Sequence, residues 1–330
     1  MALGIFFMEK MQRSKRRLRR QALDLFKGRR ILITGGTGSL GQELVRKLSA
    51  DNHVVVYSRN EDRQYMMKQT FDNDRISYLI GDVRDQETVE YAMCGCDYVI
   101  HAAAMKDLIM CEAQPTQTYL NNVEGSKSVI RAARNVDSVK KVIAVSTDKA
   151  ASPSSVYGCS KYMMEKLFEE ADRVSTATYV SVRFGNMINS NGSLISIWKQ
   201  NPKMHGNIKI THPEIARFFF TLSDAADTVI EAMAVGGGGE VFIKKMKKAK
   251  IINILQEITG REKFEVRGLF PGEKIHEDLV SQNEVHYCFD CGDYYVLRPS
   301  EYNDSPPDMF STENAEEFSH DELKELLEKC

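Results

Sequence analysis

The chain has 330 residues, with 42% hydrophobic and 27% charged side chains and a formal net charge of −2; this excludes a low-complexity chain and allows a sizeable core. Its seven cysteines are too few and too irregularly spaced for a disulfide framework, and no apolar segment approaches the length of a membrane span. We therefore expect a cytoplasmic protein with no membrane partner and no nucleic-acid partner.

The charge is unevenly distributed, and its basic part lies at the start of the chain. Residues 1–30 contain ten Lys or Arg against Glu9 and Asp24, a balance of +8 that leaves −10 for the remainder. A basic segment can bind nucleic acid or an anionic membrane. Because most charge runs are solvated surface, we expect residues 1–28 to form a partly helical arm, or a contact within a homo-oligomer.

Strands and helices are predicted to alternate from residue 29 to residue 185. This alternation indicates an α/β fold, a doubly wound parallel (Rossmann) sheet with helices on both faces. We assign residues 29–185 to one domain that binds a dinucleotide. The predicted strands are 30–34, 53–57, 76–80, 97–101, 141–146 and 178–183, and the predicted helices are 39–49, 61–69, 86–93, 117–134 and 158–171.

A glycine motif joins the first predicted strand to the first helix. Its spacing is G-x-x-G-x-x-G, and glycine lets the backbone approach a pyrophosphate at the start of the helix. The strand at 53–57 then arrives where a βαβ dinucleotide-binding unit requires it, which strengthens the assignment. The residues assigned to the cofactor here are Gly35, Thr37, Gly38, Ser39, Leu40 and Gly41.

The end of the second strand predicts which dinucleotide is bound. An NAD protein usually carries an acidic residue there for the ribose hydroxyl, but this chain has Ser58 and Arg59, with Arg63 following. Positive charge and a hydroxyl suit a 2′-phosphate, so we favour NADP, with NAD as the other possibility. The alternative is that the two arginines are solvated surface charges.

Two further strand ends are expected to contact the cofactor. Asp82 and Val83 follow the strand at 76–80, where a carboxylate can meet the adenine amine. The small residues after the strand at 97–101 would let the cofactor lie against the backbone. Simple close packing would explain either feature equally well. The small residues are Ala102, Ala103 and Ala104.

The acid–base residues predicted for catalysis follow the strand at 141–146. Asp148 and Lys149 place a carboxyl and an amine side by side at its carboxyl end, where open α/β sheets carry their chemistry. Tyr157 and Lys161 are four residues apart, so they share one face of a helix. The charge of Lys161 is expected to lower the pKa of Tyr157 and make it a general base. A structural ion pair is the alternative for Asp148 and Lys149.

Beyond residue 185 the pattern is less regular. We assign residues 186–330 to a smaller α/β substrate-binding lobe and a C-terminal tail. Within them, residues 216–235 are predicted to form a strand and a helix that return to the first domain. A turn at 271–277 is expected to lead into a helix, and a last helix is predicted at 321–329.

One cluster of possible metal ligands lies in this second part. His286, Cys288 and Cys291 could bind zinc, but a structural zinc site needs a fourth ligand, which this spacing does not supply. Residues 294–297 look like the return strand of a hairpin. We therefore predict no metal site.

Taken together, these runs resemble the extended short-chain dehydrogenase/reductases, and more narrowly the inverting UDP-N-acetylglucosamine 4,6-dehydratases of pseudaminic acid synthesis. The similarity covers residues 29–300. Its most specific part is Asp148-Lys149, because related hexose dehydratases usually carry Asp-Glu there and epimerases usually lack the pair. The shared runs are residues 34–41, 56–59, 81–85, 101–106, 146–151, 157–161, 183–186, 217–222 and 271–277.

The resemblance implies a reaction on a UDP-sugar. Tyr157 would take the C4 hydroxyl proton while NADP accepts the C4 hydride, and the resulting 4-ketone would acidify the C5 proton. A neutral Lys149, its pKa lowered by burial and by Lys161, would remove that proton, and Asp148 would protonate the departing C6 hydroxyl. Hydride return to C6 and reprotonation of C5 from the other face would give the inverted sugar. Thr147 would hydrogen-bond the 4-oxygen.

The resemblance also implies substrate-binding residues, with two departures from the family pattern. The family usually carries two arginines that clamp the nucleotide diphosphate, where this chain has Asn191 and Phe270. Lys106, Arg217 or Arg267 could compensate. The substrate-binding candidates are Lys106, Asn186, Asn191, Arg217 and Glu273.

Two other functions fit part of this set of residues. A 4-epimerase or 4-ketoreductase of the same superfamily needs Tyr157, Lys161 and the cofactor, but no base for C5. A non-catalytic NADP-binding scaffold is supported only by the two missing arginines. The complete acid–base set argues against that scaffold.

Overall fold

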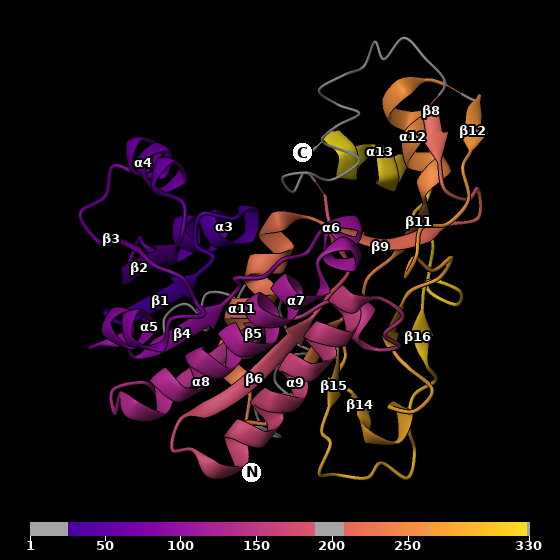
Figure 1. The fold of residues 1–330 in the computed structure, drawn as a ribbon. Helices are drawn as coiled ribbons and strands as arrows, with labels where there is room; N and C mark the ends of the chain where they lie inside the picture. The colour runs from indigo at the N-terminus through magenta and orange to yellow at the C-terminus, as the bar shows by residue number, and fades with distance from the viewer. Residues whose placement is uncertain (1–25, 189–207, 262, 329–330) are drawn as a thin grey trace.

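The computed structural model describes residues 26–188, 208–261 and 263–328, and a nine-stranded sheet forms their centre (Figure 1). Most of its strands come from the first half of the chain. The strands are β1 (Arg30–Thr34), β2 (His53–Ser58), β3 (Ile76–Ile80), β4 (Tyr98–His101), β5 (Lys141–Val145), β6 (Thr178–Arg183), β10 (Val241–Lys244), β14 (Cys288–Asp290) and β15 (Tyr294–Leu297).

The sheet has the order β14-β15-β10-β6-β5-β4-β1-β2-β3. The strands from β10 to β3 are parallel, and β15 and β14 continue the sheet in antiparallel pairing. The chain moves outward from β1 in opposite directions, so β1 and β4 flank the point where the strand order reverses. Open α/β sheets bind ligands at the carboxyl ends of the strands at this point.

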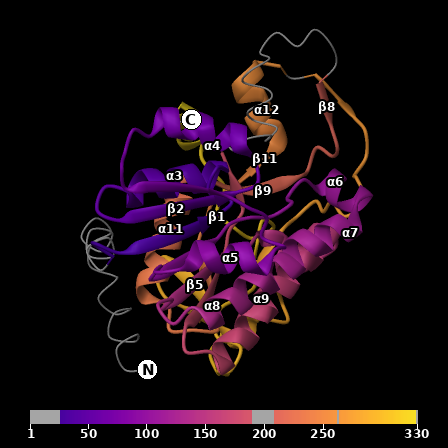
Figure 2. The ribbon, with the colours of Figure 1, turned by 60° about the vertical axis from the view of Figure 1, so that its left-hand side comes forward.

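Helices cover both faces of the sheet, which confirms the predicted doubly wound α/β fold. One face is packed by α3 (Ser39–Leu48) and α11 (Leu222–Val235), and the other by α5 (Gln86–Met93), α8 (Gly125–Asn135) and α9 (Val156–Val174), which lie side by side in Figure 2. The strands between these layers are continuously apolar, as in β2, where Val54, Val55 and Val56 are fully buried. α4 (Glu61–Thr70) follows β2.

Three small sheets form a second lobe, which lies at the upper right and right of Figure 1. A third hydrophobic cluster, which includes Phe219, Ile254 and Leu323, holds part of this lobe together. The elements of the lobe are β7 (Asn186–Met187), β8 (Ile208–Ile210), β9 (Ala216–Phe220), β11 (Lys248–Lys250), α12 (Ile251–Thr259), β12 (Phe264–Val266), β13 (Asp278–Val280), β16 (Phe310–Ser311) and α13 (His320–Glu328).

The expected division at residue 185 does not follow the sheet. Three of its strands, β10, β14 and β15, come from beyond that residue, because strand pairing between distant segments leaves no local signal in the sequence. Within residues 216–235, which we expected to return to the first domain, α11 packs on the central sheet, whereas β9 pairs with β7 and β11 in the lobe. The hairpin expected around 294–297 is confirmed by the β14–β15 pair.

Two predicted helices differ from the structure. The segment 117–134 is divided into α7 (Pro115–Thr118), a π-helical turn at Tyr119–Glu124 and α8, with α6 (Leu108–Ala113) before it. The turn at 271–277 leads into β13 and not into a helix. In the described part of the chain, no helix is long and apolar enough to cross a membrane, and no three His, Cys, Asp or Glu side chains gather as metal ligands.

Candidate active site

The predicted catalytic residues lie at the carboxyl end of β5 and at the start of α9. Two hydroxyl groups shape this region as helix caps. Thr147 caps a short 3-10 turn, Asp148–Ala150, by accepting the backbone N–H of Lys149. Ser155 caps α9, since its hydroxyl accepts the Gly158 N–H at 3.0 Å.

The side chain of Lys149 points into the protein and away from solvent. Its Nζ lies 3.0 Å from Asp148 Oδ1 and 3.3 Å from Glu277 Oε1, and the side chain is only 12% exposed. Thr147 donates from Oγ1 to the same Asp148 oxygen at 2.9 Å. The other oxygen, Asp148 Oδ2, is buried and accepts no hydrogen bond from the described residues. The structure therefore brings the predicted acid and base together.

The predicted neutral state of Lys149 is wrong for the free protein. Burial by itself would lower the pKa of the amine, but the negative charges of Asp148 and Glu277 outweigh burial and the nearby Arg217, so the pKa is raised. Lys161, which we expected to act on Lys149, donates to the Val145 carbonyl at 2.6 Å instead. Lys149 is therefore an ammonium group that must lose a proton before it can act as a base.

The predicted ionisation of Tyr157 is wrong as well. Burial raises its pKa to about 12, against the charge of Lys149 and a hydrogen bond with Thr147, which both act to lower it. Burial also lowers the pKa of Lys161 to about 8. Tyr157 is therefore a protonated phenol in the free protein, and Lys149 is the cation that acts on it.

Sequence reasoning missed Glu277, the second carboxylate beside Lys149. Its side chain is 1% exposed and lies 4.0 Å from Arg217 Nε and 3.3 Å from Lys274 Nζ. The backbone of Glu277 is fixed by two hydrogen bonds to Thr312. Glu277 ends one of the runs shared with the family, but no spacing rule connects it to Lys149, because the contact is made by tertiary packing.

The glycine motif forms a tight loop between β1 and α3. Gly35 has a φ of +69°, and a Cβ there would lie 2.8 Å from the backbone of Ala103, so Gly35 packs the loop against the residues that follow β4. A Cβ at Gly41 would lie 2.6 Å from Gly36 Cα. Gly38 is the N-cap of α3 and, as a glycine, makes no side-chain hydrogen bond there. Thr37 and Leu40 are buried below the loop, and Ser39 begins the helix.

The residues predicted to select the cofactor gather beyond β2. Arg59 Nη1 lies 3.7 Å from Asp82 Oδ2, and Arg84 Nη2 lies 2.6 Å from the same oxygen. The Ser58 hydroxyl accepts a hydrogen bond from Gln64. Arg63 is exposed on α4, whereas Val83 is buried in the core; Ala102, Ala103 and Ala104 are partly exposed at the end of β4. Charge for a 2′-phosphate is present, although Asp82 partly neutralises it.

The substrate-binding candidates are only partly accessible. Arg217 is buried, and its guanidinium donates to the carbonyls of Ala216, Lys274 and Ile275. These bonds use the N–H groups that would clamp a diphosphate. Two carboxylates also face the guanidinium, those of Glu273 at 3.7 Å and Glu277 at 4.0 Å. The Glu273 carboxylate accepts hydrogen bonds from the Thr211 hydroxyl and the Phe270 N–H. Asn186 is partly exposed and Lys106 is exposed. Asn191 lies outside the described residues.

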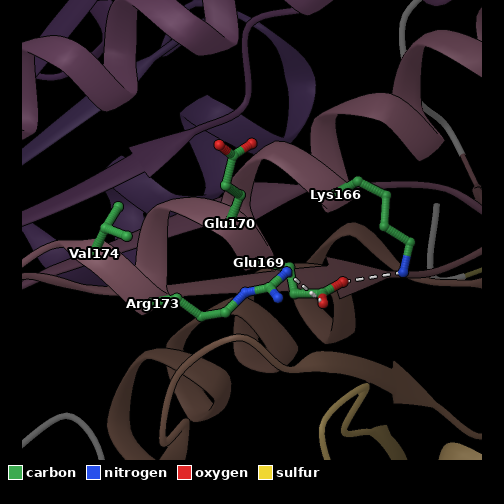
Figure 3. Close-up of a pocket in the computed structure, with 5 residues that line it drawn as sticks. All are labelled: Lys166, Glu169, Glu170, Arg173 and Val174. Atoms are coloured by element: carbon green, nitrogen blue, oxygen red, sulfur yellow. Dashed lines mark hydrogen bonds and ion pairs between the residues drawn. The ribbon is translucent and has the colours of Figure 1, made fainter.

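Figure 3 shows a shallow pocket that belongs to a different surface. Glu169 pairs there with Lys166 and Arg173, each at 3.0 Å. The pocket begins nine residues after Tyr157 on α9, roughly 14 Å along the helix. It is therefore separate from the acid–base residues. Its lining residues are Lys166, Glu169, Glu170, Arg173 and Val174.

Comparison with known proteins assigns the chain to a family. Residues 31–299 match the family model described as "polysaccharide biosynthesis protein". The chain belongs to this family. It is 36% identical over 283 residues to the UDP-N-acetylglucosamine 4,6-dehydratase (inverting) of Campylobacter jejuni, an alignment that covers 84% of each chain. It is also 34% identical to the UDP-glucose 4-epimerase of Rickettsia bellii, which covers 83% of this chain and 84% of the relative.

Solved structures agree with this family assignment. Pen from Bacillus thuringiensis superposes with a TM-score of 0.86 at 35% identity and covers 92% of this chain and 99% of its own. The dTDP-glucose 4,6-dehydratase DesIV of Streptomyces venezuelae has a TM-score of 0.69 at 18% identity over 91% and 96% of the two chains, a likeness of fold. The family member described here is thus an extended short-chain dehydrogenase/reductase, in the enzyme group of nucleotide-sugar dehydratases and epimerases.

Proposed function

We propose that this enzyme is a UDP-N-acetylglucosamine 4,6-dehydratase that inverts C5. Relatives named for this activity, at 36% and 35% identity, support the substrate and the reaction. The observation that carries the proposal is the buried pair of Lys149 and Asp148 next to Tyr157, with the amine 3.0 Å from the carboxylate. An enzyme that only oxidises and reduces C4 has no need for this second acid–base pair.

NADP is the proposed cofactor, with NAD as the alternative. The uncapped first turn of α3 would hold the pyrophosphate, and Arg59 would face the 2′-phosphate. The bound cofactor would supply hydride transfer, from C4 of the sugar at the first step and to C6 at the last. We propose that residues 29–185 carry most of this site and that residues 186–330 hold the UDP-sugar.

A hydrogen-bonded chain offers a route for the C4 hydroxyl proton. Tyr157 is a protonated phenol, so it can take that proton only as it releases its own. Thr147 bonds to Tyr157 and donates to Asp148 Oδ1 at 2.9 Å, and the released proton would pass through Thr147 to this oxygen. Asp148 would then be the carboxylic acid that protonates the C6 hydroxyl as it leaves as water.

Lys149 is the proposed base for C5. A ketone at C4 acidifies the C5 proton, and the amine of Lys149 would remove it once its own extra proton has moved to a neighbouring carboxylate. Reprotonation of C5 from the opposite face would invert the sugar. Lys106 and Arg267 are the proposed cations for the diphosphate, because the guanidinium of Arg217 is engaged by backbone carbonyls.

The second candidate function is a nucleotide-sugar 4-epimerase. The relatives from Rickettsia that are named UDP-glucose 4-epimerase, at 34% to 38% identity, favour it. One experiment distinguishes the two functions. The protein is incubated with UDP-N-acetylglucosamine and NADP+, and the mass of the product is measured by mass spectrometry. A product lighter by one water supports the dehydratase, and a product of unchanged mass whose NMR spectrum differs from that of UDP-N-acetylglucosamine supports the epimerase.

A further inference from the structure

The two carboxylates beside Lys149 are not equivalent. Asp148 comes from the same 3-10 turn as Lys149, and its Oδ1 already accepts the Thr147 hydroxyl as well as the ammonium. Glu277 reaches Lys149 from the segment before β13, with Oε1 3.3 Å from Lys149 Nζ, and its other oxygen, Oε2, lies 3.3 Å from Lys274 Nζ. Each carboxylate can therefore take a different proton.

We propose that Glu277 takes the proton of Lys149 and so converts the resting ammonium into the amine that removes the C5 proton. This inference rests on the proposed function, which already uses Asp148 for the proton that arrives through Thr147. The N–H bond at Lys149 Nζ breaks and an O–H bond forms at Glu277 Oε1. The ion pair becomes a neutral pair, the net charge is unchanged, and no oxidant or reductant is required.

The burial of Glu277 favours such a transfer, whereas the charges of Arg217 and Lys274 beside it favour the ionised carboxylate. Its side chain is 1% exposed, so a neutral pair avoids the cost of keeping two charges away from water. The backbone hydrogen bonds to Thr312 hold the carboxyl group in place beside Lys149. Four other charged or titratable groups face the pair from the elements around it: Asp148, Tyr157, Arg217 and Lys274.

Glu277 acts through Lys149 and is thus a positioning residue, which a pH profile can distinguish from a structural one. In Glu277→Gln, C5 exchange with UDP-N-acetylglucosamine should fall about 100-fold near pH 7, with KM changed less than twofold. The loss should shrink as the pH rises, because solvent then removes the proton that Glu277 no longer accepts. A loss of the same size at every pH would mean that Glu277 only supports the fold.

The titration of Lys149 in the free protein gives a second readout, independent of activity. The Nζ-bearing carbon can be followed by NMR in full-length protein with 13C-labelled lysine, its signal assigned by loss in Lys149→Met. In Glu277→Gln the midpoint should fall by at least about one pH unit, a tenfold change in proton affinity. Asp278→Asn is the matched control, since Asp278 pairs with Lys274 at 3.7 Å, whereas the ion pairs of Lys149 in the described residues are with Asp148 and Glu277. In this control the midpoint of Lys149 should not move.

Two further outcomes keep the proposal separable from the proposed function. If Glu277→Gln does not fold, Glu277→Asp takes its place. This variant should keep the pH profile of the parent at about a tenfold lower rate, because it retains a carboxylate as proton acceptor on a side chain shorter by one methylene group. If the parent exchanges the C5 proton but the Lys149 midpoint does not move in the Glu277 variant, the role of Glu277 is overturned and the proposed function stands. A shifted midpoint in a parent that exchanges no C5 proton would overturn the proposed function.

Discussion

Gly158 lies directly against the carbonyl oxygen of Lys149, and a Cβ at position 158 would be 2.4 Å from that oxygen. Gly158 stands in the first turn of α9, next to Tyr157. The missing side chain is what allows the turn that carries Lys149 to pack on the helix that carries the tyrosine. One glycine therefore sets the separation of the proposed base and the phenol.

The substitution Gly158→Ala should push these two groups apart. The neighbour is backbone, which cannot move away as a flexible side chain would, so we expect a loss of about 1–3 kcal/mol in the free energy of unfolding. Turnover of the UDP-sugar should fall about 100-fold, as for other small misplacements of catalytic groups. Urea unfolding and a rate assay measure both effects, with Cys159→Ala, at an exposed neighbouring position, as the control. Full activity in Gly158→Ala would refute this role.

Arg59 should select NADP over NAD. Its guanidinium is exposed and lies near Asp82, so it can turn toward a 2′-phosphate but has no partner on a 2′-hydroxyl. In Arg59→Ala the Kd for NADP should rise about tenfold while that for NAD changes less than twofold, a difference that calorimetric titration detects. Lys68→Ala, on the exposed side of α4, should change neither. Equal weakening of both dinucleotides would contradict the assignment.

His101 should make the fold sensitive to acid. It is fully buried between the hydroxyls of Thr34 and Ser126, and burial, with a smaller effect of Lys161, lowers its pKa to about 3. Because the unfolded imidazole binds its proton near pH 6.5, stability is complete above that pH and falls as the pH drops toward 3.

The test for His101 compares urea unfolding of the protein and of His101→Gln at two pH values. Between pH 7.5 and pH 4.5 the stability advantage of histidine over glutamine should shrink by about 2–3 kcal/mol. A constant difference across this range would show that the imidazole is not held neutral. The Gln side chain cannot titrate, so its own pH dependence reports all other groups.

Arg183 should be essential for stability. Its buried guanidinium lies 2.6 Å from Glu165 on α9 and 2.9 Å from Glu284, and it also donates to the Leu279 carbonyl at 2.9 Å. In Arg183→Met the buried Glu165 and the partly buried Glu284 would lose their cation, at a cost of about 3–5 kcal/mol in urea unfolding. A loss below about 1 kcal/mol would mean that the two carboxylates find other partners or become protonated.

The sequence was most informative where the physical signal is local. Continuous apolar runs such as 54–56 predict buried parallel strands, and the hydroxyl-capped segments around Asp148 and Tyr157 lie where their motifs indicated. It failed where distant segments meet. The charge of Lys149 depends on Glu277, and no spacing rule in the sequence connects these two residues. The sheet is completed by β10, β14 and β15, and no spacing rule predicts that these strands join it. The π-helical turn at 119–124 keeps the apolar pattern of a helix and so gave no signal of its own.

The most direct test of the dehydratase mechanism is an NMR spectrum of the product formed from UDP-N-acetylglucosamine in deuterated water. We predict a 4-keto-6-deoxy sugar with deuterium at C5 and inverted configuration at that carbon, and no C5 exchange in Lys149→Ala, which should still bind the nucleotide. A product that keeps its C6 hydroxyl and its original C5 proton would contradict the account.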